Sequence, residues 1–141
     1  MTYTNVYLNF PGTCEEAFKA YEKILGGKIL AMLTAKGTPM ESQVPPELAH
    51  RIMHARMTVG STMVMGSDTP ASHYRQPQGF SVNIGTETAA EADRIYAALA
   101  EGGQQTMPIA ETFWAHRFGA CVDKWGTPWL VNCEKAGLGR P

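Results

Sequence analysis

The sequence contains the same helical pattern twice, 75 positions apart. Thr13 and Glu16 precede one apolar stripe, and Thr88 and Glu91 precede another. Each Thr-x-x-Glu is typical of a capping box, in which the threonine hydroxyl accepts a hydrogen bond from the backbone three residues on. The stripes comprise Ala17, Phe18, Tyr21, Ile24 and Leu25, then Ala92, Ile95, Tyr96 and Leu99, and each ends at two glycines. The repeat predicts a chain built from two related modules.

Strand patterns flank both stripes. Apolar and polar residues alternate over 5–10 before the first stripe and over 80–85 before the second, as expected of strands with one buried face. Three strand-like runs follow each stripe, at 28–33, 52–59 and 62–66, then at 104–109, 116–122 and 128–134. The predicted fold class is α+β, with two paired βαβββ modules whose strands form a mixed sheet.

The length of the chain favours one domain. It has 141 residues, and a module of about 70 residues would leave one face of its sheet bare. We expect a single domain over 1–141, with module one at about 3–66, a linker at 67–78 and module two at about 79–134. The Pro-rich stretch 35–51 is long for a connection, which predicts a functional cover or a mobile loop.

Composition excludes several classes of partner. The formal net charge is -1 and the basic residues are scattered, so we expect neither nucleic acid nor an anionic membrane as a partner. The sequence has no apolar run of about 20 residues and no signal peptide pattern, which predicts a cytoplasmic protein. Cys14, Cys121 and Cys133 form no CxxC pair, and buried or half-buried thiols without a catalytic role are expected.

Alternation assigns residues to two faces of each sheet. Within 52–59, it places Met53, Ala55, Met57 and Val59 under the helix, and His54, Arg56 and Thr58 on the opposite face. Further residues assigned to the polar faces are Asn5, Tyr7, Asn9, Ser81, Asn83, Leu130, Asn132 and Glu134. We expect these faces to line a cleft between the modules that binds a small molecule.

Several segments resemble the PhnB-like branch of the vicinal oxygen chelate superfamily, which includes glyoxalases, bleomycin-resistance proteins and extradiol dioxygenases. The resemblance extends over about 3–134, and it rests on 7–10, 15–21, 52–55, 111–119 and 123–129. It implies that the two modules form a cup-shaped mixed sheet, that the cup binds a small molecule, and that the protein is a homodimer. Two functions follow as hypotheses: a lyase-like or isomerase-like enzyme for a small oxygen-rich or carbonyl compound, or a protein that sequesters a planar or apolar ligand without chemistry.

The resemblance also implies four positions for the ligands of a divalent metal, a histidine or glutamine and a glutamate from each module. Here those positions fall on Asn5 or Val6, on 63–65, on Phe80 or Ser81, and on Leu130. Aliphatic and thioether groups are poor ligands for hard or borderline cations, so we expect no metal site of this type and no other cofactor. Branch members are often labelled 3-demethylubiquinone 3-methyltransferases, but the sequence lacks a glycine-rich turn with a downstream acidic residue that would hold a nucleotide-bearing methyl donor.

His54 and Arg56 are the first candidate site. The imidazole can serve as a base or a hydrogen-bond donor, while Arg56 can hold a carboxylate, phosphonate or enolate oxygen. The structural alternative is a histidine bonded to a backbone carbonyl beside an Arg–Glu pair.

Glu111 and His116 form the second candidate site, with Trp114 between them. The carboxylate can act as a general base or fix the tautomer of the histidine. Alternatively, the neighbouring aromatics fill a core or a dimer interface and Glu111 pairs with Arg117. We predict His54 and Glu111 as catalytic residues. The predicted ligand-binding residues are Tyr7, Arg56, Asn83, Trp114, His116 and Asn132.

Overall fold

The computed structural model describes residues 1–137 and contains two compact units, with the boundary between Arg75 and Gln76. Unit 1 contains β1 (Val6–Phe10), α1 (Cys14–Leu25), β2 (Lys28–Thr34), β3 (Ile52–Val59) and β4 (Thr62–Asp68). Unit 2 contains β5 (Val82–Gly85), α2 (Ala89–Ala100), β6 (Gln104–Ala110), β7 (Ala115–Val122) and β8 (Pro128–Glu134). Both units have the βαβββ order that the sequence predicted, and the α+β class is confirmed.

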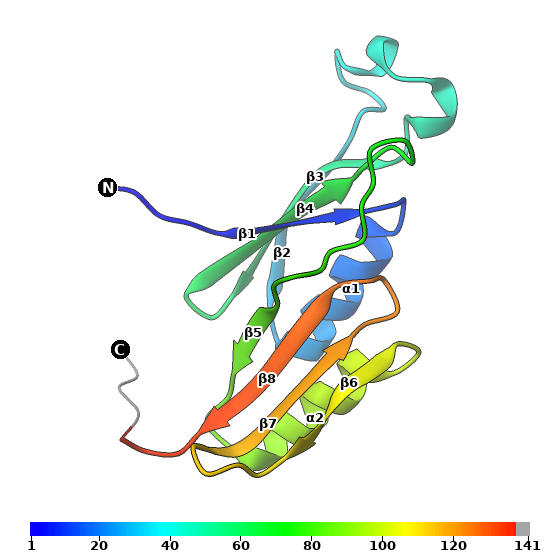
Figure 1. Cartoon of the computed structure of the whole chain (residues 1–141). Coiled ribbons are helices and arrows are strands. Elements are labelled where there is room, and N and C mark those ends of the chain that lie inside the picture. Colours follow the sequence, from blue (N-terminus) through cyan, green and yellow to red (C-terminus); the bar gives the residue numbers. More distant parts are fainter. Residues whose placement is uncertain (138–141) are drawn as a thin grey trace. The chain divides into compact units, whose positions relative to one another are not determined.

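The two sheets have the same topology. Their strand orders are β1-β4-β3-β2 and β5-β8-β7-β6. In each sheet the strand that precedes the helix pairs in parallel with the last strand, and the other pairs are antiparallel. Each helix lies along one face of its own sheet, which leaves the other face of that sheet without a helix (Figure 1).

One strand is shorter than the alternation predicted. β5 begins at Val82, and Phe80 lies before it with half of its surface exposed. Val82 pairs with Trp129, so Ser81 would have to pair with Pro128. Because proline has no backbone N–H, the ladder cannot extend by this residue.

The apolar side of each sheet packs against its helix. In unit 1 the stripe residues Ala17, Phe18 and Tyr21 are buried. They face the sheet side that carries the buried residues Leu8, Phe10, Ala55, Met57 and Val64. In unit 2, α2 buries its predicted stripe, and the sheet contributes Ala115, Cys121, Trp129, Val131 and Cys133. The helical stripes predicted from the sequence are therefore the contacts that hold each helix on its sheet.

Glycines allow an aromatic ring of each helix to approach the sheet. A Cβ atom on Gly66 would lie 2.9 Å from Phe18 Cε1 and 2.8 Å from the carbonyl oxygen of Leu8. In unit 2, a Cβ atom on Gly119 would lie 2.9 Å from Tyr96 Cε1. All three distances are shorter than van der Waals contacts permit, so a larger residue at either position would push the aromatic ring of the helix away from the sheet.

The predicted capping box at the start of α1 is wrong. Thr13 makes no side-chain capping bond, and its hydroxyl oxygen is buried without a partner among the described residues. Asp68, at the end of β4, replaces it: Oδ1 accepts from the backbone N–H groups of Gly12 (3.1 Å) and Cys14 (2.9 Å). Its Oδ2 accepts from Ile52 N–H at 2.9 Å. One carboxylate thus joins three elements of unit 1.

The threonine cap predicted for α2 is confirmed. Thr88 has extended backbone angles, and its hydroxyl accepts from the backbone N–H of Glu91 at 3.1 Å. This is the first half of the predicted capping box.

A buried carboxylate organises the hairpin between β7 and β8. Asp123 is 3% exposed. Its Oδ1 accepts from the backbone N–H groups of Trp125 (2.9 Å) and Thr127 (3.0 Å), and its Oδ2 accepts from Trp129 Nε1–H at 2.8 Å. The turn from Asp123 to Gly126, closed by the hydrogen bond from Gly126 N–H to the Asp123 carbonyl, therefore has a structural role that needs no ligand.

The three cysteines are buried and free, as the sequence predicted. Burial, with a smaller contribution from Asp68, raises the pKa of the Cys14 thiol to about 12. Burial and Asp123 raise the pKa of Cys121 to about 11. Thiolates are the reactive form of cysteine, so both side chains are poor nucleophiles near neutral pH.

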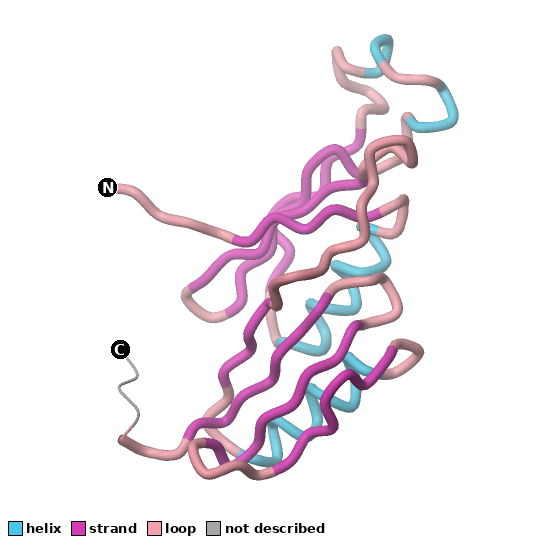
Figure 2. The backbone as a smooth tube through the Cα atoms, in the orientation of Figure 1, coloured by secondary structure: helices cyan, strands magenta, loops and turns pink. Residues whose placement is uncertain are grey.

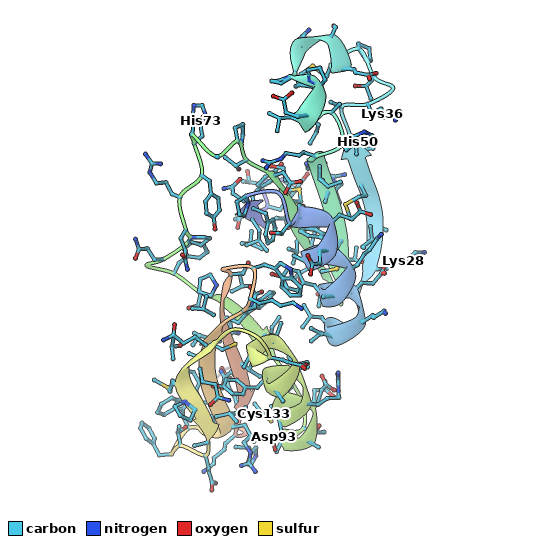
Figure 3. The ribbon with its side chains drawn as sticks, turned by 90° about the vertical axis from the view of Figure 1, so that its right-hand side faces the viewer. Lys28, Lys36, His50, His73, Asp93 and Cys133 are labelled. Carbon is cyan, nitrogen blue, oxygen red and sulfur yellow. The ribbon has the colours of Figure 1, made fainter. Side chains whose placement is uncertain are left out.

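The stretch 35–51 contains two short 3-10 helices, Glu41–Gln43 and Pro46–Leu48, and extends beyond the strands of unit 1 (Figure 2). Lys36 N–H donates to the carbonyl of Ala49 at 3.0 Å. Figure 3 shows Lys36 and His50 close together at the base of this loop. Among residues 1–137, no helix has the length and apolar character needed to cross a bilayer.

Candidate functional site

The polar face of the first sheet brings together three of the predicted site residues. Tyr7 on β1 pairs with Met65 on β4, and Met65 pairs with Arg56 on β3. His54 precedes Arg56 by two residues on the same strand, and Ala55 between them is buried under α1. Tyr7, His54 and Arg56 therefore lie on the face of the sheet that α1 leaves uncovered.

Tyr7 and His54 contact each other across β4. The Tyr7 hydroxyl lies 3.3 Å from His54 Nδ1, and the ring centroids are 5.8 Å apart. Tyr7 is 41% exposed and His54 is half-buried. The contact differs from the structural alternative considered for His54, because its partner is a side chain on another strand rather than a backbone carbonyl.

Arg56 is the positive group of this face. It is exposed, and no carboxylate in the described part of the chain lies within 4.0 Å of its guanidinium. It lines a depression of about 520 Å³ in unit 1, together with Thr4, Asn5, Thr58, Ser61 and Thr62. A free guanidinium among hydroxyl and amide groups is suited to an anionic oxygen.

The hydroxyl groups beside Arg56 were not predicted as site residues, apart from the assignment of Thr58 to the polar face. Ser61 and Thr62 follow the Gly60 turn between β3 and β4. A glycine between two strand-like runs is a turn signal, but only the antiparallel pairing of Thr58 with Met63 shows that the turn returns the chain to the side of Arg56.

Apolar groups flank His54. Leu33 on β2 pairs with His54 and is 55% exposed. Met53, which the alternation placed under the helix, is 39% exposed instead, and this assignment is wrong. The physical reason is a register irregularity, because Thr34 pairs with Ile52 while the adjacent Leu33 pairs with His54, which leaves Met53 outside the ladder.

The predicted site residues of unit 2 are spread over its sheet. Asn83 on β5 is exposed, and Asn132 on β8 donates from Nδ2 to Glu134 Oε1 at 3.0 Å. Trp114 makes edge contacts with Phe113 and Phe118, with centroid distances of 4.9 and 5.3 Å. His116 is exposed, and its carbonyl accepts from Arg117 Nη1. These contacts hold the aromatic side chains together and leave His116 at the surface.

Glu111 and Arg117 have different partners from those considered in the sequence. Glu111 pairs with Lys135 at 3.1 Å, and Arg117 pairs with Asp93 of α2 at 3.0 Å. Figure 3 shows Asp93 on this helix. The hydrogen bond from Lys135, followed by its charge, lowers the pKa of the Glu111 carboxyl. A lowered pKa makes a weaker general base, so the catalytic role of Glu111 stays a prediction that its surroundings do not favour.

The residues at the superfamily's metal positions do not fit a divalent ion. Val64 is in the core, and Met65 lies in the ladder between Tyr7 and Arg56. The guanidinium beside this position would repel a second cation. Within residues 1–137, no three His, Cys, Asp or Glu side chains are grouped so that they could hold a metal ion.

Comparisons with known proteins identify the family. Residues 3–132 match the family described as 3-demethylubiquinone-9 3-methyltransferase, and the chain belongs to this family. It is the PhnB-like branch of the vicinal oxygen chelate superfamily, and the fold is that of glyoxalase and bleomycin-resistance proteins.

The chain is similar to several proteins over nearly its whole length. It is 32% identical to protein YjdN of Escherichia coli, with 92% of this chain and 93% of YjdN covered. Protein PA1353 from Pseudomonas aeruginosa, for which a crystal structure is known, is 41% identical in sequence to this chain. The match covers 95% of this chain and 98% of PA1353, with a TM-score of 0.86. A PhnB protein from Bacillus cereus shares the fold, with 22% identity, a TM-score of 0.80 and coverage of 94% and 99%.

Proposed function

We propose that this protein binds a small molecule with an anionic oxygen at the polar face of the unit 1 sheet. Arg56 carries the proposal, because an exposed guanidinium without an acidic partner in residues 1–137 lines a depression of hydroxyl and amide groups. Carboxylate, phosphonate and enolate groups have the charge and geometry that such a guanidinium binds. Leu33, which pairs with His54 and is exposed, favours a ligand that also has an apolar part.

We propose an enzyme acting on a small oxygen-rich or carbonyl compound as the first form of this function, without a divalent metal at the superfamily positions. The contact between Tyr7 and His54 supports it, since it orients an imidazole beside Arg56. The alternative is a protein that sequesters its ligand without chemistry. Turnover of the bound compound separates the two, because a sequestering protein releases its ligand unchanged. Methyl transfer is not proposed, since the sequence lacks the turn that holds the methyl donor.

Replacement of Arg56 tests the binding site. We expect wild-type protein to bind phenylphosphonate or benzoate saturably, and Arg56→Met to bind the same probe about 10- to 150-fold more weakly, since a charge-assisted hydrogen bond contributes about 1.5–3 kcal/mol. Chemical shifts in a titration followed by NMR would measure both affinities.

The matched control for this titration is Arg56→Lys, which retains the positive charge but not the planar fork, and should fall between the other two proteins. Equal affinity of wild type and Arg56→Met would place the anion elsewhere.

We also propose a homodimer, on the basis of the family. Sedimentation equilibrium of the purified chain should then give a mass near twice 15.4 kDa. A concentration-independent mass of one chain would overturn the dimer, but it would leave the Arg56 site in place, because that site is formed by unit 1 of a single chain.

A further inference from the structure

We propose that Tyr7 holds His54 in the tautomer with hydrogen on Nε2, so that His54 acts on the ligand as a hydrogen-bond donor and not as a base. The inference rests on the proposed function, since it concerns the same face of unit 1. It assigns Tyr7 as a positioning residue, and it restricts the ligand to one whose recognised group only accepts hydrogen bonds.

The direction of the contact between Tyr7 and His54 carries the first step. A phenol oxygen shares its lone pair with the ring, so phenol is a better donor than acceptor, whereas the unprotonated imidazole nitrogen is a strong acceptor. At 3.3 Å from Nδ1, the Tyr7 hydroxyl therefore donates to this nitrogen. In a neutral histidine, the hydrogen must then be on Nε2.

Among the described residues, Tyr7 is the one group that hydrogen-bonds to the His54 ring. Leu33 is the residue of β2 that pairs with His54, and its side chain is apolar. In the described residues no carboxylate lies within 4.0 Å of the His54 ring. In hydrolytic triads a carboxylate accepts a hydrogen bond from Nδ1–H, which leaves Nε2 unprotonated as the general base. Here a phenol donates to Nδ1, so the lone pair of Nδ1 is occupied and the hydrogen is on Nε2. Nε2–H is left free to reach a ligand.

Two donors then lie on the same face of β3, and Arg56 is the one that lines the depression. Arg56 follows His54 by two residues, which places their Cα atoms about 6–7 Å apart at the ordinary rise of a strand. The guanidinium and Nε2–H can both donate, and neither can accept. The preferred group is therefore an oxyanion that accepts at two oxygens, such as a carboxylate or a phosphonate. In a reaction, His54 would polarise the oxygen by hydrogen bonding, and no proton would leave Nε2.

Histidine NMR of ¹⁵N-labelled protein at pH 8.5 tests the tautomer. This pH is about two units above the ordinary histidine pKa of about 6.5, so neutral imidazole is observed. We expect the Nε2–H pattern for His54 in wild type and an average of both tautomers in Tyr7→Phe, which keeps the ring. Tyr74→Phe is the control, because it removes a hydroxyl of unit 1 outside the strands, and the other three histidines serve as references in the same spectra.

The outcomes separate this inference from the proposed function. An Nδ1–H pattern in wild type, or an unchanged His54 pattern in Tyr7→Phe, would overturn the role of Tyr7 whether or not phenylphosphonate binds. A shifted pattern supports it, and Tyr7→Phe should then bind phenylphosphonate about two- to five-fold more weakly, as the competent tautomer becomes a fraction of the population. Failure of wild type to bind either anionic probe would contradict the proposed function, while the tautomer measurement would still decide the role of Tyr7.

Discussion

Asp123→Ala is expected to lower the free energy of unfolding of unit 2 by about 3–5 kcal/mol, because each donor that loses its acceptor costs about 1–3 kcal/mol. The substitution leaves three donors without their acceptor, the backbone N–H groups of Trp125 and Thr127 and the indole N–H of Trp129. Trp129 and Thr127 are almost fully buried, so water cannot easily replace the carboxylate. Urea unfolding followed by tryptophan fluorescence measures this loss, because all three tryptophans are in unit 2.

Two variants make this result specific. Asp123→Asn retains one acceptor oxygen and should destabilise less than Asp123→Ala. Glu101→Ala removes an exposed carboxylate at the end of α2 and should change stability by no more than about 0.5 kcal/mol. If Asp123→Ala unfolded within 1 kcal/mol of wild type, the carboxylate would not be the group that holds this hairpin.

Asp68→Ala is expected to cost unit 1 about 2–3 kcal/mol, since a capping bond contributes about 1 kcal/mol and three backbone N–H groups lose their acceptor. Far-UV circular dichroism in urea measures the loss. The substitution also removes a negative charge beside Cys14. The pKa of that thiol should therefore fall below about 12, while burial, its larger cause, keeps it above the ordinary value. The pH dependence of alkylation by iodoacetamide reports this change.

Asp68→Asn separates the two effects on unit 1. The amide oxygen can still cap Gly12 and Cys14, whereas its NH₂ group faces the N–H of Ile52, so stability should be intermediate. The charge beside Cys14 is removed in both variants, so both should lower its pKa. An unchanged thiol pKa together with wild-type stability would contradict the role of Asp68.

Local patterns predicted most of the fold. The bounds of β3 and β8 agree with the sequence, because alternation over seven or eight residues is sufficient to define a strand. The same alternation identified Arg56 and His54 as neighbours on one face, and the structure places them there. These features depend on residues two or three positions apart, which a sequence displays directly.

Features that depend on distant residues could not be predicted in this way. Asp68 caps a helix 54 residues before it in the chain, and Lys135 rather than Arg117 pairs with Glu111. The exposure of Met53 depends on how β3 pairs with β2, which no local pattern records. The contact of Tyr7 with His54 likewise requires that β4 be placed between their strands.

The two helix caps differ in when they can form during folding. The cap of α2 joins residues three positions apart, so it is available as soon as that segment begins to coil. The cap of α1 requires Asp68 at the end of β4. Bringing this residue to the helix closes a long loop of chain, and the step is slow because the loop loses conformational entropy. We therefore expect two units with the same topology to differ in folding order: α2 can form before its sheet, whereas the cap of α1 is completed only after its sheet has closed.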